Sequence, residues 1–399
     1  MNYVFKAVLR NGQHPENGVV TIPFPIPREE YDYVVELLRG MDIGDPVKRD
    51  CHLGGIDSYY SVLNRMVDLP QNLDELDYLA KRLDSFSVGE DAQFQAMAHK
   101  LELFDAKDLI NLTFCCQQAT VITDFSNLEK VGKDHYMNLH GGCAKTEELE
   151  NLDGVETAHL LIADGDGTIT PYGVAYDNGM KLEQLYDGQH FPGYLYDGDT
   201  VLVVSISPKE APRDDEHKTL LFLPAADSQI ERSMVRAGIR DGDEMRIDLD
   251  SWMRYTGVFT EMFMECESLR ELNEMAKGLA QLDDLEQKKL CAAARLAEPY
   301  TAKYILNLTR QLDLFDFAPG VSTPEEYGKD MIRDSGHYEY DENLSEFYNF
   351  KEYAQQRIES QRGMFTPEGD ISYHGEMRID EVMYGRMNDP NDFQMGGMR

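Results

Sequence analysis

The chain has few positive charges. Its 399 residues include 38 Lys and Arg against 73 Asp and Glu, which gives a formal net charge of −35. A surface this poor in cations repels a phosphate backbone, so we expect no direct nucleic-acid binding. The acids are spread along the chain rather than collected in a tail, which predicts that they lie on folded surface. A merely soluble or halophile-like protein would show the same excess, so charge alone leaves the function open.

Long apolar runs and patterned cysteines are also missing. No window approaches the ~18 apolar residues of a membrane span, and the N-terminal residues lack the apolar core of a signal peptide. The six cysteines are irregularly spaced and include no Cys-x-x-Cys pair, so neither a disulfide framework nor a zinc motif is indicated. Cys115 and Cys116 follow an apolar run and are expected in the core. We expect a soluble, cytoplasmic protein with reduced thiols and no membrane partner.

Signatures of catalysis are absent as well. The sequence contains no P-loop, dinucleotide-binding, zinc-protease or nucleophile-elbow motif. The stretch "DGDGT" (Asp164–Thr168) begins like a calcium loop but lacks the glycine and glutamate that such a loop needs further on. His135, His140 and Cys143 lie close in sequence, but the spacing supplies no fourth metal ligand. We therefore expect no enzyme activity, no cofactor and no bound metal.

What the chain does contain is an internal repeat. "NLDELDYLAKRL" (Asn72–Leu83) returns as "SLRELNEMAKGL" (Ser268–Leu279), 196 residues later. At the same offset, "LINLT" matches "ILNLT" and "SNLEKVGKD" matches "STPEEYGKD". These blocks share fourteen identical residues without a gap between them. The pattern indicates a duplicated module of roughly 120 residues, much longer than the ~20–50 residues of a solenoid repeat.

Each module reads as mainly helical. Asn72 and Ser268 are predicted N-caps, and Glu75 and Glu271 follow three residues later as in a capping box. In the first copy, leucines at helical spacing (73, 76, 79 and 83) predict the buried stripe, while Asp74, Glu75 and Asp77 are expected to face solvent. Further helices are predicted, in pairs, at 29–39 and 226–237, 92–104 and 286–297, and 106–112 and 301–311.

Residues 150–210 read differently, because short β-rich runs alternate there with Asp-Gly and Asn-Gly turns. This pattern predicts an antiparallel module inserted between the copies. The expected fold is α+β, in an elongated multi-domain chain. The expected domains are a first module (1–140), a β-rich insert (141–215), a second module (216–335), and an acidic extension with a helix, a short hairpin and a frayed tail (336–399).

A family resemblance enters in the second half of the chain. The segments "SLRELNEMAKGLAQL", "LDLFDFAPGVSTPEEYGKDMIRDSG", "LSEFYNFKEYAQQR" and "FTPEGDISYHG" follow one another between roughly residues 220 and 375. In this order and spacing they resemble the ArdA antirestriction family, and through the repeat the resemblance extends weakly to 20–135. Members of that family are elongated, acidic and usually dimeric DNA mimics, which occupy the DNA-binding groove of type I restriction–modification enzymes.

The resemblance implies a DNA-mimic inhibitor, and elementary geometry is compatible with that function. Acids at positions i and i+4 of a helix stand about 6 Å apart, close to the phosphate spacing along one DNA strand. The candidate partner-binding carboxylates are Asp74, Glu75, Asp77, Glu271, Glu274, Asp313, Asp316, Glu325, Glu326, Asp330, Asp334, Glu339, Asp341, Glu342 and Glu346. Their expected role is phosphate imitation, and none is expected to be catalytic.

Other interpretations remain open from the sequence. The target could be another DNA-handling defence enzyme, such as an RNA-guided nuclease, or the protein could be an acidic scaffold that binds a basic protein without imitating DNA. The family's homodimer is implied too, although one chain with two copies could supply both halves alone. The one modest basic cluster, Arg232, Arg236 and Arg240, lies at helical spacing, and we expect it to pair with nearby acids.

Overall fold

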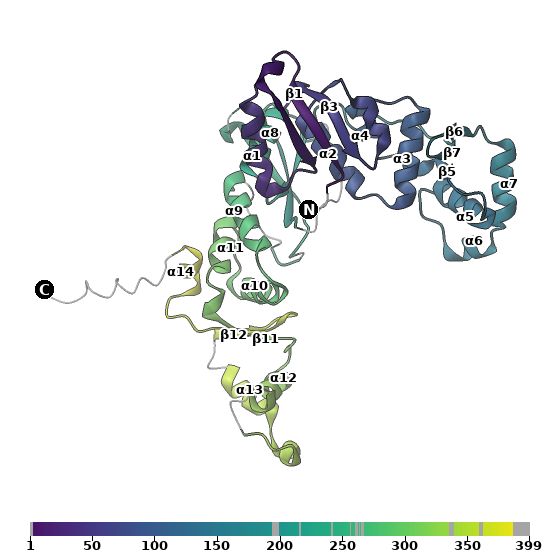
Figure 1. The fold of residues 1–399 in the computed structure, drawn as a ribbon. Coiled ribbons are helices and arrows are strands. Elements are labelled where there is room, and N and C mark those ends of the chain that lie inside the picture. The colour runs from purple at the N-terminus through teal and green to yellow at the C-terminus, as the bar shows by residue number, and fades with distance from the viewer. Residues whose placement is uncertain are drawn as a thin grey trace. The chain divides into compact units, whose positions relative to one another are not determined.

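The computed structural model describes residues 3–193, 199–214, 217–240, 242–255, 257–259, 262, 264, 267–334, 339–358 and 362–385. Contacts divide the chain into two compact units, which are described separately. Unit 1 comprises Met1–Tyr196, Ser207–Leu220 and Ala226–Met245, and unit 2 comprises Asp197–Ile206, Leu221–Ala225 and Arg246–Arg399. Each unit combines helices with small sheets (Figure 1), which confirms the predicted α+β class. No helix in the described residues is both long and apolar enough to cross a bilayer.

Unit 1 is built around a four-stranded sheet in the order β2-β1-β3-β4. Its strands are β1 (Phe5–Asn11), β2 (Val19–Phe24), β3 (Cys51–Ser58) and β4 (Pro70–Gln71). Burial alternates along β1, so Phe5, Ala7 and Leu9 face the core, as period-two side-chain geometry requires. The helices of this part are α1 (Arg28–Arg39), α2 (Leu73–Asp84), α3 (Val88–Lys100), α4 (Ala106–Leu112) and α8 (Asp227–Arg236). The buried leucine stripe of α2 is confirmed.

The rest of unit 1 forms a smaller lobe with its own sheet, in the order β5-β7-β6. Its elements are β5 (Thr120–Ile122), α5 (Leu128–Leu139), α6 (Thr146–Asn151), α7 (Gly154–Asp164), β6 (Thr168–Thr170) and β7 (Gly173–Tyr176). Helices α5 and α7 pack against each other beside this sheet (Figure 1). We call this part lobe 1.

Unit 2 repeats this plan. Its elements are β8 (Leu202–Pro208), β9 (Thr219–Leu223), β10 (Met245–Trp252), α9 (Leu269–Ala280), α10 (Asp284–Ala297), α11 (Ala302–Thr309), β11 (Phe315–Pro319), α12 (Pro324–Lys329), a π turn (Asp330–Asp334), η9 (Glu342–Phe347), α13 (Phe350–Ile358), β12 (Arg362–Phe365), β13 (Gly369–Tyr373) and α14 (Ile379–Met383). Its sheets are ordered β10-β8-β9 and β11-β13-β12, and α12 packs against α13. We call the part from β11 to β13 lobe 2.

Corresponding hydrogen bonds show how far the repeat extends. The Tyr60 hydroxyl donates to Leu83 O at 3.1 Å, and the Tyr255 hydroxyl donates to Leu279 O at 3.1 Å. In the lobes, Thr170 Oγ1 donates to Gly173 O at 2.8 Å. The equivalent bond in lobe 2, from Thr366 Oγ1 to Gly369 O, measures 2.7 Å. Each copy therefore includes both a main sheet and a lobe, and the expected length of roughly 120 residues is too short.

The predicted β-rich insert at 141–215 is wrong for the same reason. Its first half supplies α6, α7, β6 and β7 to lobe 1, and β8 joins the sheet of unit 2. No strand is present in residues 177–193, the described part of the segment after β7. The side chain of Asn111 instead binds the backbone of Tyr186: Oδ1 accepts from Tyr186 N at 2.7 Å and Nδ2 donates to Tyr186 O at 3.1 Å. Asn307 Nδ2 holds Met383 O in the same way at 2.9 Å.

The C-terminal extension is likewise the second half of copy two. The predicted hairpin exists as β12 and β13, but β11 pairs with β13 as a third strand. Residues 387–399, expected to be frayed, lie outside the described residues.

The predicted helix starts are largely confirmed. Asn72 Oδ1 accepts hydrogen bonds from the backbone of Asp74 and Glu75, and Ser268 Oγ accepts one from Glu271 N. Both are therefore N-caps. Neither glutamate completes the predicted capping box: the Glu75 carboxylate is used elsewhere, and Glu271 Oε2 accepts from Ser268 Oγ at 2.9 Å.

Matching glycines allow the helix pair of each lobe to approach closely. A Cβ atom on Gly132 of α5 would lie 1.9 Å from Gly154 O, and one on Gly328 of α12 would lie 2.1 Å from Phe350 O. These distances are far below van der Waals contact, so a side chain at either position would force the helices apart.

We predict that Gly132→Ala and Gly328→Ala each destabilise their own lobe by at least ~1–3 kcal/mol, because overpacking must displace a helix backbone. Hydrogen exchange of α7 and of α13 measures the effect lobe by lobe. Gly242→Ala is the matched control, since no atom of the described residues lies within 4 Å of its added Cβ. Unchanged protection of α13 in Gly328→Ala would contradict the close packing.

Candidate functional site

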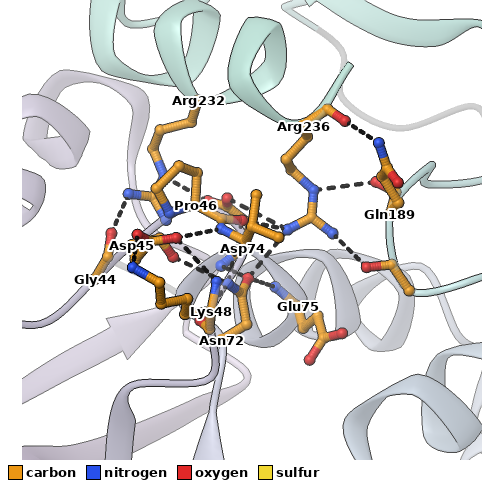
Figure 2. A network of polar contacts seen from close by, with 12 residues as sticks. Gly44, Asp45, Pro46, Lys48, Asn72, Asp74, Glu75, Gln189, Arg232 and Arg236 are labelled. Carbon is orange, nitrogen blue, oxygen red and sulfur yellow. Dashed lines mark hydrogen bonds and ion pairs between the residues drawn. The ribbon is translucent and has the colours of Figure 1, made fainter. Parts of the chain in front are cut away.

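Three of the fifteen candidate carboxylates do not face solvent. Asp74, Glu75 and Asp77 of α2 are exposed by only 8, 3 and 4%. The prediction that they form part of an acidic surface is therefore wrong. Figure 2 shows that Asp74 and Glu75 belong to a polar network in unit 1, where α8 covers the start of α2.

Asp74 is held by arginine and tyrosine side chains. Its Oδ1 accepts from Arg232 Nε at 2.8 Å and from the Tyr31 hydroxyl at 2.7 Å, and Arg236 Nη1 lies 3.7 Å from its Oδ2. Burial and the neighbouring Asp74 charge raise the pKa of Tyr31 well above its usual value, so this hydroxyl remains a donor. Burial disfavours the Arg232 charge, but the ion pair with Asp74 outweighs that effect and its pKa is raised.

Arg236 ties several backbone segments together. Its guanidinium donates to Pro46 O at 2.6 Å, to Gln189 O at 3.2 Å and to the N-cap oxygen of Asn72 at 3.3 Å. It also stacks over the ring of Phe191 at 4.3 Å. Arginine suits this position because its planar fork carries five donors on a permanently charged group.

Glu75 and Asp77 are neutralised within unit 1 as well. Arg49 places Nε 3.3 Å from Glu75 Oε2, and its Nη1 lies 2.5 Å from Asp105. The hydrogen bond to Asp105 is the main reason that the pKa of Arg49 is raised. Asp77 accepts from Ile26 N at 2.7 Å and pairs with Lys81 at 3.0 Å. These carboxylates therefore serve the fold.

The arginine cluster was predicted to pair with nearby acids. Arg232 does so, and Arg236 lies at a weaker ion-pair distance, but their acid is Asp74, which is distant in sequence. Arg240 is exposed. Helical spacing identifies the shared face of Arg232 and Arg236, but it cannot reveal that α2 lies opposite.

We predict that Asp74→Asn destabilises unit 1 by about 3–5 kcal/mol, because Arg232 would remain buried without its counter-charge. Urea unfolding monitored on unit 1 measures the loss. The double variant Asp74→Leu/Arg232→Met should recover most of it, because it removes both charges and keeps apolar volume. A double variant no more stable than Asp74→Asn would show that the pair's hydrogen bonds, rather than an orphaned charge, dominate.

The remaining candidates lie in unit 2, and most are exposed. We call the following ten exposed carboxylates the acidic surface of unit 2: Glu271, Glu274, Asp313, Asp316, Glu325, Glu326, Glu339, Asp341, Glu342 and Glu346. Asp330 is half-buried, and the side chain of Asp334 lies outside the described residues.

Local cations neutralise only part of this surface. Glu274 pairs with Lys277 at 3.0 Å, Glu325 pairs with Lys329 at 2.9 Å, and Asp316 lies 3.8 Å from His374. The Lys329 hydrogen bond lowers the pKa of Glu325, and backbone and side-chain bonds from Ser322 lower that of Glu326. Within the described residues, seven members form no ion pair: Glu271, Asp313, Glu326, Glu339, Asp341, Glu342 and Glu346. Their charge is therefore available to a partner.

Sequence reasoning missed one carboxyl group next to this surface. Asp370 on β13 is only 6% exposed, and its position in lobe 1 is taken by Val174. Burial, together with the charge of Asp330, raises the pKa of Asp370 to about 6. The folded protein thus keeps this proton up to about pH 6, whereas the unfolded chain releases it near 3.8. The stability of unit 2 therefore falls as the pH rises from 3.8 to 6, and the full loss is present above pH 6.

We predict that Asp370→Asn stabilises unit 2 by up to about 3 kcal/mol above pH 6, because the amide cannot ionise in this buried position. The gain should shrink as the pH falls through 6 and vanish below the usual aspartate pKa of 3.8. Urea unfolding across this range gives the measurement. Asp313→Asn, an exposed and unpaired control, should show no such dependence. A pH-independent gain for Asp370→Asn would rule out ionisation as its cause.

Other candidate chemistry finds no support in the described residues. No three His, Cys, Asp or Glu side chains gather there as metal ligands. His135 Nδ1 bonds with Thr120 Oγ1 at 2.9 Å, and His140 Nδ1 with Tyr136 O at 2.7 Å. Cys115 and Cys116 are buried, as predicted, and burial raises both thiol pKa values.

Unit 1 also has a cleft of about 460 Å³, lined by α1, the loop after it and α8. Its buried cation, Arg232, is paired with Asp74. Its carboxylates Asp45 and Asp50 accept hydrogen bonds from backbone N–H groups of the loop. Arg232, Asp45 and Asp50 therefore stabilise the loop and its contact with α8.

No protein-family model matches the chain, and no curated protein matches it significantly. The acidic surface of unit 2 is therefore the feature on which a functional proposal must rest.

Proposed function

We propose that this protein is a cytoplasmic DNA-mimic inhibitor that occupies the DNA-binding groove of a type I restriction–modification enzyme. The observation that carries the proposal is the acidic surface of unit 2, where seven of ten exposed carboxylates have no ion pair within the described residues. A surface that is merely solvated would be expected to intersperse both signs of charge more evenly.

The chemistry of the partner follows from this charge. A DNA-binding groove contacts phosphates through lysine, arginine and backbone N–H groups, and these contacts carry no sequence information directly. A protein that presents carboxylates on a rigid scaffold can satisfy the same groups. The net charge of −35 adds long-range attraction, which accelerates encounter with a basic groove and weakens as salt is added.

Unit 2 supplies the mimic surface in this proposal, and the network of Asp74, Glu75 and Asp77 has only a structural role. Two of the candidate acids of unit 2 are already ordered by hydrogen bonds: Asp341 caps η9 by accepting from Asn343 N at 2.9 Å, and Glu326 accepts from Ser322 N at 2.9 Å. Rigid carboxylates lose less conformational entropy on binding than flexible ones.

We predict that neutralising Glu339, Asp341, Glu342 and Glu346 as Gln or Asn raises the inhibitory concentration against a type I enzyme by about ten-fold or more, because a loss of ~1.4 kcal/mol already gives that factor. DNA cleavage by the purified enzyme is measured at several salt concentrations. Inhibition by the unchanged protein should weaken with salt, and the variant should show a shallower salt dependence. The control neutralises four exposed acids of unit 1 instead: Glu29, Asp57, Asp68 and Glu102.

Three outcomes would contradict the proposal. Equal loss of inhibition in both variants would point to net charge rather than to the unit 2 surface. A ternary complex in which the enzyme holds the protein and still cleaves duplex DNA would favour a scaffold that binds without imitating DNA. Salt-sensitive inhibition of an RNA-guided nuclease, with no effect on type I enzymes, would identify a different target.

A further inference from the structure

The turn η9 exposes two large apolar side chains among the acids of unit 2. Phe347 is 82% exposed and Leu344 is 48% exposed. Asp341, Glu342 and Glu346 surround them in sequence and are exposed as well. Single exposed apolar residues are common on protein surfaces and need no explanation. Two that form one patch can instead indicate a binding site, so the arrangement of Leu344 and Phe347 matters.

The geometry of the turn places the two side chains together. In a 3₁₀ helix, residues i and i+3 eclipse one another, so Leu344 and Phe347 project from the same side. Glu342 and Glu346 occupy the other two rows of this helix. The turn therefore presents one apolar patch bordered by carboxylates. We call Leu344 and Phe347 the apolar tip.

Other residues hold the turn in shape, so the apolar tip is not needed for that purpose. Asp341 Oδ1 accepts from Asn343 N at 2.9 Å, and Asp341 N donates to the Tyr348 hydroxyl at 3.4 Å. The Tyr348 ring lies 5.3 Å from that of Tyr340 and 5.9 Å from that of Phe350. Aromatic packing thus supports the turn through these three rings, while Phe347 remains outside.

Lobe 1 provides an internal comparison. At the same offset of 196, the equivalents of Leu344 and Phe347 are Glu148 and Asn151, both exposed on α6. The acid Glu346 has an acidic equivalent, Glu150. The same lobe architecture therefore forms with polar residues at these positions, so the fold does not explain why lobe 2 has a leucine and a phenylalanine there.

We propose that the apolar tip is an anchor that enters an apolar pocket between the cations of the partner's DNA-binding groove. The proposal rests on the proposed function and names the part of unit 2 that adds affinity beyond charge. The chemistry of the partner's pocket follows from charge complementarity, because an apolar patch bordered by carboxylates fits an apolar pocket bordered by lysines or arginines. Aromatic side chains suit such anchors, since they bury a large area and lose little conformational entropy.

The two kinds of contact differ in their response to salt. Charge pairing weakens as ionic strength rises, whereas apolar burial does not. Removal of the apolar tip should therefore lower affinity by a constant factor at every salt concentration, and removal of the bordering carboxylates should reduce the salt dependence itself.

The test measures the dissociation constant of the full chain with the methyltransferase core of a type I restriction–modification enzyme at several salt concentrations. We predict that Leu344→Ala/Phe347→Ala weakens binding about ten- to one-hundred-fold with an unchanged salt slope. Glu342→Gln/Glu346→Gln should give a shallower slope. Val88→Ala in unit 1 is the matched control, because Val88 is equally exposed at 82% and should leave binding unchanged.

The outcomes separate the two proposals. Binding that responds to the carboxylate variant but not to the apolar tip variant overturns the anchor and leaves DNA mimicry standing. A changed salt slope in the tip variant also overturns it, because the residues would then act by positioning the carboxylates. Absence of any salt-sensitive binding by the unchanged protein overturns both. Circular dichroism confirms that the variants fold, as the polar equivalents in lobe 1 lead us to expect.

Discussion

The ion pair between Asp74 and Arg232 determines how the acidic sequence of unit 1 must be interpreted. A carboxylate exposed by only 8% survives in the fold because Arg232 and Tyr31 bind one of its oxygens and Arg236 lies near the other. Without α8, the first turn of α2 would carry two acids beside an apolar core. The arginines of α8 thus allow the acidic first turn of α2 to be buried. Several simultaneous hydrogen bonds and ion pairs offset the free-energy cost of burying these charges.

The equivalent helix of unit 2 shows what α2 would look like without such a cover. Asp77 corresponds to Asn273, and each accepts a backbone N–H from the segment before the first helix of its copy, at 2.7 and 2.8 Å. This shared role needs only an oxygen acceptor, so either residue serves. Glu75 corresponds to Glu271, however, and Glu271 is exposed. One capped helix therefore buries its acids in the first copy and presents them in the second.

These differences explain what the sequence could and could not predict. Local rules sufficed for the helices, the N-caps and the leucine stripe of α2, because each depends on residues within a few positions. The burial of Asp74 depends on Arg232, which is 158 residues away, and periodicity contains no such information. The sequence predicts too short a repeat because parts of its second half preserve interactions but not residues: Asn111 and Asn307 hold backbone groups of Tyr186 and Met383, which share no side-chain chemistry.

The repeat also changes how the acidic surface should be weighed. Where both copies keep an acid at one position, as at Glu150 and Glu346, comparison of the copies gives no reason to prefer a binding surface over an ordinary solvated one. Where the copies differ, both residues are compatible with the same fold. The requirements of the fold therefore do not explain which residue each copy has. Lobe 2 differs from lobe 1 by an apolar pair in place of Glu148 and Asn151, and by Asp370 in place of Val174. The first change exposes apolar area and the second buries a carboxyl group, so neither favours stability. Both changes lower stability in lobe 2 and are absent from lobe 1. Selection for binding to a partner of unit 2 is the simplest explanation for such changes.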